Sequence, residues 1–372
     1  MPRDRRLTSA TRLVAASALV LGALLPGEAG AQAPVLLEGL LDLEGWSTGR
    51  GSVLTARNDG RAAALARLAL WSAVEPWRGL VVHAQVEVAG GPASGEERVE
   101  VEVEQAGVRW QRSDALVLDA GLMPSIVGAF AGRRLSTHNP LIGRPDGYPV
   151  DYPLGLRIGG ELGRVDYRAA LVSRPPTDER YVPEPSNAAR VAMGAGLTPM
   201  TGVRVGGSFT HGPYLNRSLE AQTLHGGEWC DFAQTVAAVD AQFSRGYFEA
   251  RGELAYAWYD VPGIAGRAFG VTHYTELRYT LTPRLFVAAR AEQNRYPYIQ
   301  PGAQGAWTTG RPTVTDAEAG VGYRVGVRTL VKASFRRDWW TSERAARPFL
   351  PDGYAWAVQL SQGIDLLSPL RR

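Results

Sequence analysis

Apolar and polar residues alternate along most of the chain after residue 154, in segments of roughly 10–13 residues. Side chains of a strand point to opposite faces with a period of two, so residues 328–336 would form a strand with two unlike faces. One face would carry Val331, Ala333 and Phe335, and the other Arg328, Lys332, Ser334 and Arg336. The apolar face suits lipid and the charged face requires water. This pattern predicts a transmembrane antiparallel β-barrel.

The same pattern predicts about 16 strands over the chain. They are residues 35–48, 60–74, 78–90, 97–112, 114–123, 154–162, 165–174, 188–198, 201–212, 231–244, 247–260, 267–281, 284–297, 313–324, 327–340 and 353–367. Very short connections, such as 163–164, 245–246 and 325–326, alternate with longer ones. Such alternation is typical of a barrel with periplasmic turns and external loops. An even number of strands then places both termini on the periplasmic side.

The first 31 residues have the organisation of a secretory signal peptide. Arg3, Arg5, Arg6 and Arg12 precede an apolar run at 13–25, a Pro-Gly pair follows at 26–27, and small residues occupy 29–31. The run is too short for a membrane-spanning helix, which needs about 20 residues. We therefore expect cleavage near Ala31, an outer-membrane location, and a barrel domain that comprises residues 32–372.

Composition excludes several other classes of protein. A formal net charge of +3 is too small to indicate a nucleic-acid partner. The single cysteine, Cys230, and five scattered histidines form no metal-binding motif, and no nucleophile with a paired base is visible. We expect no cofactor, no metal and no enzymatic activity. Tryptophan, tyrosine and glycine are plentiful, as in barrels with aromatic girdles, and Lys332 is the only lysine.

A barrel of about 16 strands encloses a lumen wide enough for water. Strand parity places charges of both signs on the lumen face. This predicted pore lining consists of Glu100, Glu102, Glu104, Arg157, Arg168, Arg204, Glu249, Arg251, Glu253, Arg278, Arg290, Lys332 and Arg336. The polar face of a soluble sandwich would meet bulk solvent instead. The alternation of short and long connections favours the barrel over that alternative.

The third external connection, residues 124–153, is the longest. It contains Ile126, Val127, Phe130, Leu141 and Ile142, which need burial away from water. A long structureless loop in a compact domain usually has a function or a binding partner. We expect this loop to fold into the lumen, where the strands would cover its apolar residues.

A signal peptide, about 16 strands and a long third loop make the chain resemble a general bacterial porin. The strand exit at Gly121, Leu122, Met123 and Pro124 is similar to that of the phosphate-selective porin O/P group, although no motif carries a phosphate site. The resemblance implies passive diffusion of small hydrophilic solutes, contact with outer-membrane lipid, and a homotrimer as a possible assembly. It also implies that the third loop constricts the pore with Arg133, Arg134, His138, Arg144, Asp146 and Asp151.

Two questions stay open at this point. The barrel could instead be non-conducting and serve as an anchor, adhesin or receptor. In the third loop, Arg133, Arg134 and Arg144 outnumber Asp146 and Asp151, which predicts a slight preference for anions. Alternatively, these arginines pair with carboxylates of the wall and hold the loop in place, which would remove the preference.

Overall fold

The computed structural model of the protein describes residues 35–49, 52, 62–91, 99–147, 151–177, 182, 186–223, 228–302, 306–342 and 352–367. The predicted signal peptide and its cleavage site lie outside these residues. Within the described part of the chain, no helix is long and apolar enough to cross a membrane.

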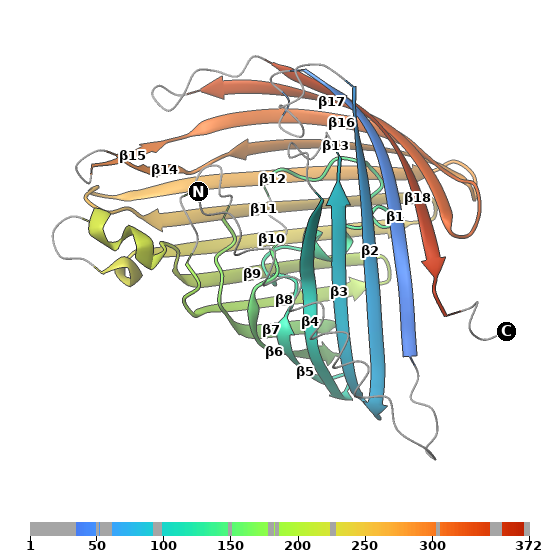
Figure 1. Ribbon diagram of the computed structural model, residues 1–372, viewed down its shortest axis with the longest axis horizontal. Helices are drawn as coiled ribbons and strands as arrows, with labels where there is room; N and C mark the ends of the chain where they lie inside the picture. The colour runs from blue at the N-terminus through green and yellow to red at the C-terminus, as the bar shows by residue number, and fades with distance from the viewer. Residues whose placement is uncertain are drawn as a thin grey trace.

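Sixteen antiparallel strands close into a barrel (Figure 1). They are β1 (Val35–Thr48), β2 (Ala62–Trp77), β3 (Leu80–Gly90), β4 (Glu100–Ser113), β5 (Leu116–Leu122), β6 (Leu154–Leu162), β7 (Val165–Val172), β8 (Arg190–Met200), β9 (Val203–Pro213), β10 (Ala233–Arg245), β11 (Phe248–Asp260), β12 (Arg267–Thr280), β13 (Leu285–Arg295), β16 (Pro312–Arg324), β17 (Thr329–Ser342) and β18 (Gly353–Asp365). Each corresponds to one of the predicted strands, so the predicted fold class is confirmed.

Neighbouring strands in the barrel follow the order of the sequence, and the ring closes where β1 pairs with β18. Glu38 at the start of β1 lies opposite Asp365 at the end of β18. Both ends of the barrel domain therefore lie at the rim that carries the short turns. This arrangement is the one that an even number of strands requires.

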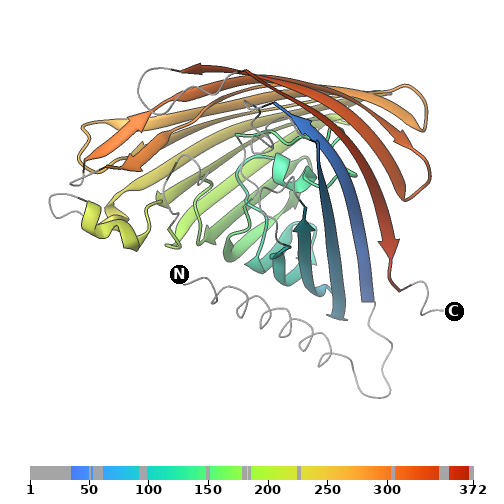
Figure 2. The same cartoon turned by 45° about the horizontal axis from the view of Figure 1, so that its top comes forward.

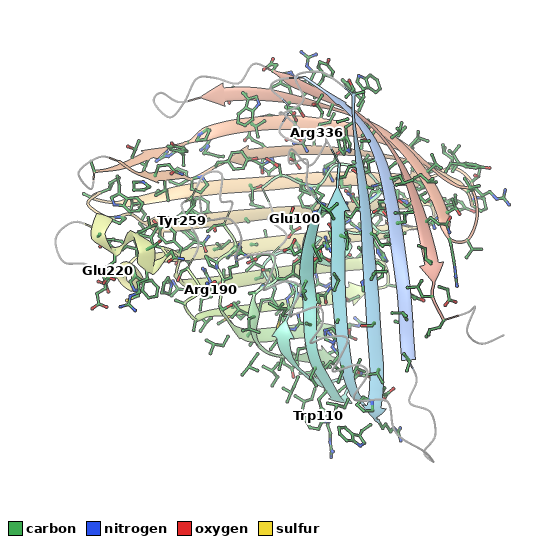
Figure 3. The ribbon with its side chains drawn as sticks, in the orientation of Figure 1. Glu100, Trp110, Arg190, Glu220, Tyr259 and Arg336 are labelled. Atoms are coloured by element: carbon green, nitrogen blue, oxygen red, sulfur yellow. The ribbon has the colours of Figure 1, made fainter. Side chains whose placement is uncertain are left out.

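Burial alternates along the strands as the sequence pattern predicts. On β11, Leu254 is 46% exposed on the outer face, whereas the adjacent Glu253 is 4% exposed and points inward. On β17, Val331 is 40% exposed and Lys332 only 2%. Trp110 on β4 points away from the ring at its lower edge (Figure 3). The outer face is thus apolar and the inner face polar, as a barrel in lipid needs.

A β-bulge interrupts this alternation in β4. Val103 pairs with Val86 and Gln105 with Gln85, so Glu104 is the extra residue on β4. A bulge lets two consecutive side chains point to nearly the same side. Glu104 and Gln105 consequently both turn toward Gln85. The Gln85 side-chain amide donates to Glu104 at 2.5 Å, and the Gln105 amide donates to the Gln85 side-chain oxygen at 2.6 Å.

The long connections carry short elements of their own. One of them forms a hairpin of β14 (Tyr298–Pro301) and β15 (Trp307–Gly310), a segment that the sequence pattern left as a loop. Two 3₁₀ helices, η4 (Arg217–Gln222) and η5 (Trp229–Asp231), belong to another. Ile299 and Trp307 of the hairpin pack with Tyr214 and Leu215 in a small apolar cluster beside the external ends of the strands.

The third connection enters the barrel. Figure 2 shows its short 3₁₀ helix η3 (Phe130–Arg133) inside the ring of strands. We call residues 123–153 loop 3.

Candidate functional site

Apolar side chains of loop 3 are buried against inward-facing residues of the strands. Ile126 packs with Val172 and Ala192. Val127 packs on an apolar patch of β10 and β11, and Ile142 packs on β1 and β18 next to Trp46. Burial of these groups favours a loop folded inward over one exposed to water. The predicted path of loop 3 through the lumen is confirmed.

Polar contacts fix the middle of loop 3. The Lys332 ammonium on β17 donates hydrogen bonds to the carbonyl oxygens of Ser136, Asn139 and Leu141 at 2.9, 3.0 and 2.9 Å. The Ser136 hydroxyl donates to Asp42 at 2.6 Å. The Gly143 N–H donates to Glu318 at 2.9 Å. Residues 136–143 are therefore held at both ends by a carboxylate and in between by an ammonium group.

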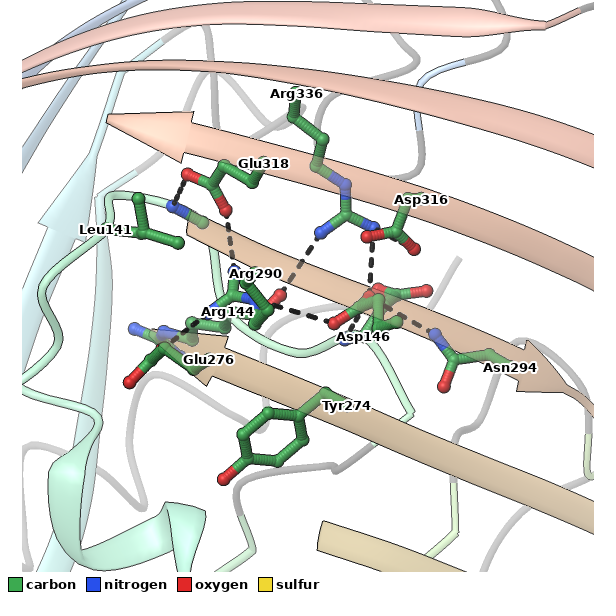
Figure 4. Close-up of polar contacts among 12 residues, drawn as sticks. Leu141, Arg144, Asp146, Tyr274, Glu276, Arg290, Asn294, Asp316, Glu318 and Arg336 are labelled. Atoms are coloured by element: carbon green, nitrogen blue, oxygen red, sulfur yellow. Dashed lines mark hydrogen bonds and ion pairs between the residues drawn. The ribbon is translucent and has the colours of Figure 1, made fainter. Parts of the chain in front are cut away.

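The wall beneath this part of loop 3 is acidic. Five carboxylates from β12, β13, β16 and β17 face inward there, and we call them the acidic wall: Glu276, Glu292, Asp316, Glu318 and Asp338. Two guanidinium groups lie among them (Figure 4). Arg290 contacts Glu318 at 2.6 Å and Glu276 at 3.4 Å. Arg336 contacts Asp338, Asp316 and Glu292 at 2.7, 3.0 and 3.1 Å.

Loop 3 covers this network through its backbone. The Asp146 N–H donates to Glu292 at 3.0 Å, and the Arg144 carbonyl accepts from Arg336 at 3.3 Å. The side chains of Arg290 and Arg336 are 0% and 1% exposed. Arg290, Lys332 and Arg336, which the sequence predicts to line the pore, thus face the inside of the barrel but are covered by loop 3.

Two arginines of loop 3 form ion pairs with the wall. Arg133 contacts Glu276 at 2.9 Å and donates to the Tyr274 hydroxyl at 2.9 Å. Arg134 contacts Glu87 at 3.2 Å and also pairs with Glu104. Their charges are therefore directed at wall carboxylates. The second of the two sequence hypotheses, in which arginines hold the loop, describes Arg133 and Arg134.

Arg144 differs from those two arginines. Its guanidinium makes no ion pair or hydrogen bond with the part of the chain that the structure describes, and the residue is half-buried. Burial, together with the neighbouring positive charges of Arg67 and Arg134, lowers its pKa to about 10. The group still carries its proton at neutral pH. Of the three loop 3 arginines at 133, 134 and 144, Arg144 is the one that no carboxylate of the described residues pairs with.

The remaining predicted constriction residues have different surroundings. Asp146 is half-buried and accepts a hydrogen bond from the Tyr296 hydroxyl. Asp151 is buried, lies 3.5 Å from Arg174, and burial raises its pKa to about 6. His138 is exposed on the loop, next to Thr137.

The opposite side of the lumen is basic. We call Arg157 on β6, Arg168 on β7 and Arg204 on β9 the basic strip. These residues line a cavity of about 540 Å³ between the wall and residues 124–132 of loop 3. The Arg157 and Arg204 side chains are 17% and 21% exposed. The cavity extends to Gly163 and Thr198, so it lies near the rim that carries the short turns.

Glycines on β8 and β9 make room for the basic strip. A Cβ atom at Gly194 would lie 2.9 Å from Arg168 Nε, and one at Gly206 would lie 2.9 Å from Arg204 Nη1. A Cβ atom at Gly196 would collide with Arg204 and Asp166. The arginine side chains lie flat over these positions. The sequence reasoning missed these glycines, although their spacing on the inward parity of a strand was the available signal.

The other predicted lining residues divide between the two ends of the lumen and loop 3. Near the rim that carries the short turns, Glu249 pairs with Arg251 and Arg278, both at 3.1 Å. Glu253 is buried under loop 3, where it accepts a hydrogen bond from the Ala129 N–H at 2.5 Å. Glu100 and Glu102 are exposed at the external end of β4, and Glu104 is buried beside Arg134.

A metal site finds no support in the described residues, where no group of three or more His, Cys, Asp or Glu side chains could hold an ion.

Comparison with known proteins identifies the fold. Neither a protein-family description nor a curated protein matches the sequence. Among solved structures, an anion-selective porin from Comamonas acidovorans superposes with a TM-score of 0.58 at 10% identity, covering 90% of this chain and 100% of that one. A loop L8 deletion mutant of OmpT, an outer membrane protein of Vibrio cholerae, gives 0.59 at 12% identity, covering 89% and 99%. The trimer form of in-vitro folded OmpT gives 0.56 at 11% identity, covering 88% and 99%. The protein therefore has the fold of outer-membrane β-barrels.

Proposed function

We propose that the protein is a porin-like channel for passive diffusion of small hydrophilic solutes or ions across the outer membrane. The observation that carries this proposal is the uneven cover of the lumen by loop 3. The loop buries the acidic wall but leaves the basic strip partly exposed beside open volume, and Arg251 and Arg278 are partly exposed as well. Charged side chains of a barrel interior need water, and connected water is a path for solutes.

The fold supports the same proposal. Sixteen strands give a barrel whose lumen exceeds what wall side chains alone fill. One structure with this fold is described as an anion-selective porin. Our proposal places the chain among porins in general. Its likeness to the phosphate-selective O/P group rests on the strand exit at 121–124 alone and is not part of the proposal.

The proposal includes the setting of the channel. The protein would reside in the outer membrane after signal-peptide cleavage, contact lipid through its apolar outer face, and act without a cofactor or a catalytic step. A homotrimer is the assembly that we propose, since a structure with this fold is described in a trimer form. Chemical cross-linking of the protein in intact outer membranes tests this assembly, and only monomers after cross-linking would contradict it.

A non-conducting barrel is the alternative, and the deep burial of loop 3 favours it. Loop 3 contacts β1, β10, β11 and β17 through apolar clusters and hydrogen bonds, as a plug would. An anchor, adhesin or receptor could have such a filled lumen.

Single-channel recording separates the two. Purified protein refolded in detergent would be inserted into a planar bilayer in KCl solution. A porin gives discrete conductance steps of uniform size, whereas a plugged barrel gives none. Protein that is folded, as shown by β-sheet circular dichroism and heat-modifiable migration on gels, but produces no steps would contradict the channel proposal.

A further inference from the structure

We propose that the basic strip is a transient binding site for small oxyanions, centred on Arg168. This inference rests on the proposed channel function and names the class of solute that the channel favours. The site would be formed by the Arg168 guanidinium, with Arg157 and Arg204 on either side and the backbone of loop 3 opposite.

The basic strip carries more positive charge than its neighbouring carboxylates neutralise. Asp119 pairs with both Arg109 and Arg157, at 2.7 and 2.9 Å. Asp166 and Asp240 both pair with Arg204, at 2.8 and 2.6 Å. Three arginines thus pair with three aspartates, and Arg168 is the surplus cation. Arg164 and Glu161 also line the cavity, and their opposite charges leave this balance unchanged.

The Arg168 guanidinium makes one hydrogen bond with the described residues. Its Nη2 donates to the Gly128 carbonyl of loop 3 at 3.3 Å, and its Nε has no hydrogen-bond partner in the described structure. A guanidinium has five N–H donors, and it binds oxyanions through pairs of them. Nε is buried against Gly194, so the donors that Arg168 offers to a phosphate or a carboxylate are those of its terminal nitrogens, of which Nη1 makes no hydrogen bond within the described residues.

The cavity beside the basic strip has room for a small anion. Gly194, Gly196 and Gly206 remove the side chains that would otherwise stand between the arginines and the wall. Across the cavity, a Cβ atom built on Gly132 of loop 3 would meet no atom within 4 Å. With about 540 Å³ available, the cavity holds a hydrated oxyanion together with ordered water.

The carboxylates of the acidic wall are shielded from a solute in the cavity. The acidic wall would repel anions, but its carboxylates are 0–2% exposed under loop 3 and paired with Arg290 and Arg336. Electrostatic interactions with a solute are strongest for the charges nearest to it and are screened at longer range. The open volume is lined by four arginines and by the two carboxylates Glu161 and Asp166, so positive charge is in excess there and favours an anion.

Inorganic phosphate is the probe for this site. In planar bilayers with KCl, we expect the wild-type channel to be more permeable to chloride than to potassium. Added phosphate should reduce the chloride current with a saturating dose dependence. Arg168→Gln should move the reversal potential toward cations and raise the half-inhibiting phosphate concentration about tenfold, the factor for losing one charge-assisted hydrogen bond.

Arg284→Gln is the matched control, because Arg284 is exposed in the short turn between β12 and β13 and does not line the cavity. It should leave both the reversal potential and the phosphate inhibition unchanged. Conductance steps in Arg168→Gln with wild-type reversal potential and wild-type phosphate inhibition would overturn the oxyanion site but leave the channel function standing. No conductance in the wild type would instead refute the channel function.

A second variant tests the site if Arg168→Gln does not fold. Gly194→Val keeps every charge but displaces the Arg168 side chain, since its Cβ would lie 2.9 Å from Nε. It should weaken phosphate inhibition as Arg168→Gln does. Gly207→Val is its control on the outer face of β9, where the new Cβ makes only an ordinary contact at 3.5 Å. Equal phosphate inhibition in the two valine variants would contradict the proposed site.

Discussion

Lys332 shows how one residue can determine the path of a long loop. The chain has no other lysine, although Lys and Arg together number 40. An ammonium group donates three hydrogen bonds from one point in tetrahedral directions, and three carbonyls of loop 3 converge on it at 2.9–3.0 Å. A guanidinium is planar and spreads its donors over a larger fork. The local geometry of loop 3 thus requires the residue type that the rest of the chain avoids.

Lys332→Met removes the ammonium and keeps the length of the side chain. Three buried carbonyls would lose their donor, at a cost of about 1–3 kcal/mol for each unsatisfied group. Loop 3 should detach from the wall while the barrel remains closed. We expect larger and noisier conductance steps with unchanged heat-modifiable migration. Lys332→Arg should not restore wild-type conductance, and wild-type recordings from either variant would refute this role of Lys332.

Asp151 gives a prediction about pH. Burial raises its folded-state pKa to about 6, above the usual 3.8. The folded state then binds more protons than the unfolded state between these values, so this group stabilises the protein below pH 4 and its contribution is lost as pH rises through 6. Asp151→Asn should flatten the decrease in unfolding free energy between pH 4 and 7. Parallel pH profiles of variant and wild type in urea titrations would show that Asp151 is not responsible.

At the scale of elements, the strands were predictable because their signal is local. Each strand must alternate apolar and polar residues to separate lipid from the lumen, and this requirement leaves a pattern that can be read from one segment alone. The hairpin β14–β15 lacks that pattern. Ile299 and Trp307 are buried against other external loops, and such contacts between distant segments leave no periodicity in the sequence.

The candidate site was predictable only in part for the same reason. Parity correctly placed Arg168, Glu253 and Lys332 on the inner face. Which of these side chains meet the open lumen depends on the path of loop 3, which is determined by non-local contacts such as that of Ile142 with Trp46. The sequence therefore predicted the lumen residues without separating covered from uncovered ones.

Ser334 on β17 illustrates this difference. Parity alone predicts that an inward-facing Ser334 accepts an arginine, but the residue is 6% exposed beneath loop 3. A Cβ atom built on the neighbouring Gly320 would lie 3.1 Å from the Ser334 Cβ and 3.0 Å from the Leu141 side chain. Leu141 of loop 3 thus packs close to Ser334. Ser334→Arg should therefore displace loop 3 and raise the conductance while the barrel stays folded.

Leu254→Arg is the complementary change on the lipid face of β11. It should reduce the unfolding free energy by about 2–4 kcal/mol near the bilayer midplane, because a charged group would enter hydrocarbon. Refolding titrations into lipid vesicles measure both variants. The same loss of stability in Ser334→Arg and Leu254→Arg would contradict the assigned faces.

Across the whole molecule, loop 3 converts a lumen of mixed charge into an asymmetric one. Acidic residues concentrate on β12, β13, β16 and β17, where loop 3 buries them, and arginines concentrate on β6, β7 and β9, where a cavity lies between the wall and loop 3. The formal net charge of +3 gives no hint of this separation. If the protein conducts as proposed, its selectivity depends on the charges beside the cavity, and a change in the path of loop 3 would alter it without any change in composition.

The orientation of the barrel can be tested with the native cysteine. Cys230 lies in η5, in the connection between β9 and β10, at the rim opposite the short turns. If the short turns are periplasmic, Cys230 faces the cell exterior and is partly exposed there. A membrane-impermeant maleimide should label it on intact cells.

The control places a cysteine at the other rim. In a Cys230→Ser background, Arg284→Cys puts the thiol in an exposed short turn. This variant should react only after the outer membrane is permeabilised, because the reagent must first reach the periplasm. The two thiols differ in rim but both are accessible to water, so burial cannot account for a difference between them. The opposite result would be labelling of Arg284→Cys on intact cells together with no labelling of Cys230 in the wild type. It would reverse the orientation and place the basic strip near the external mouth of the pore.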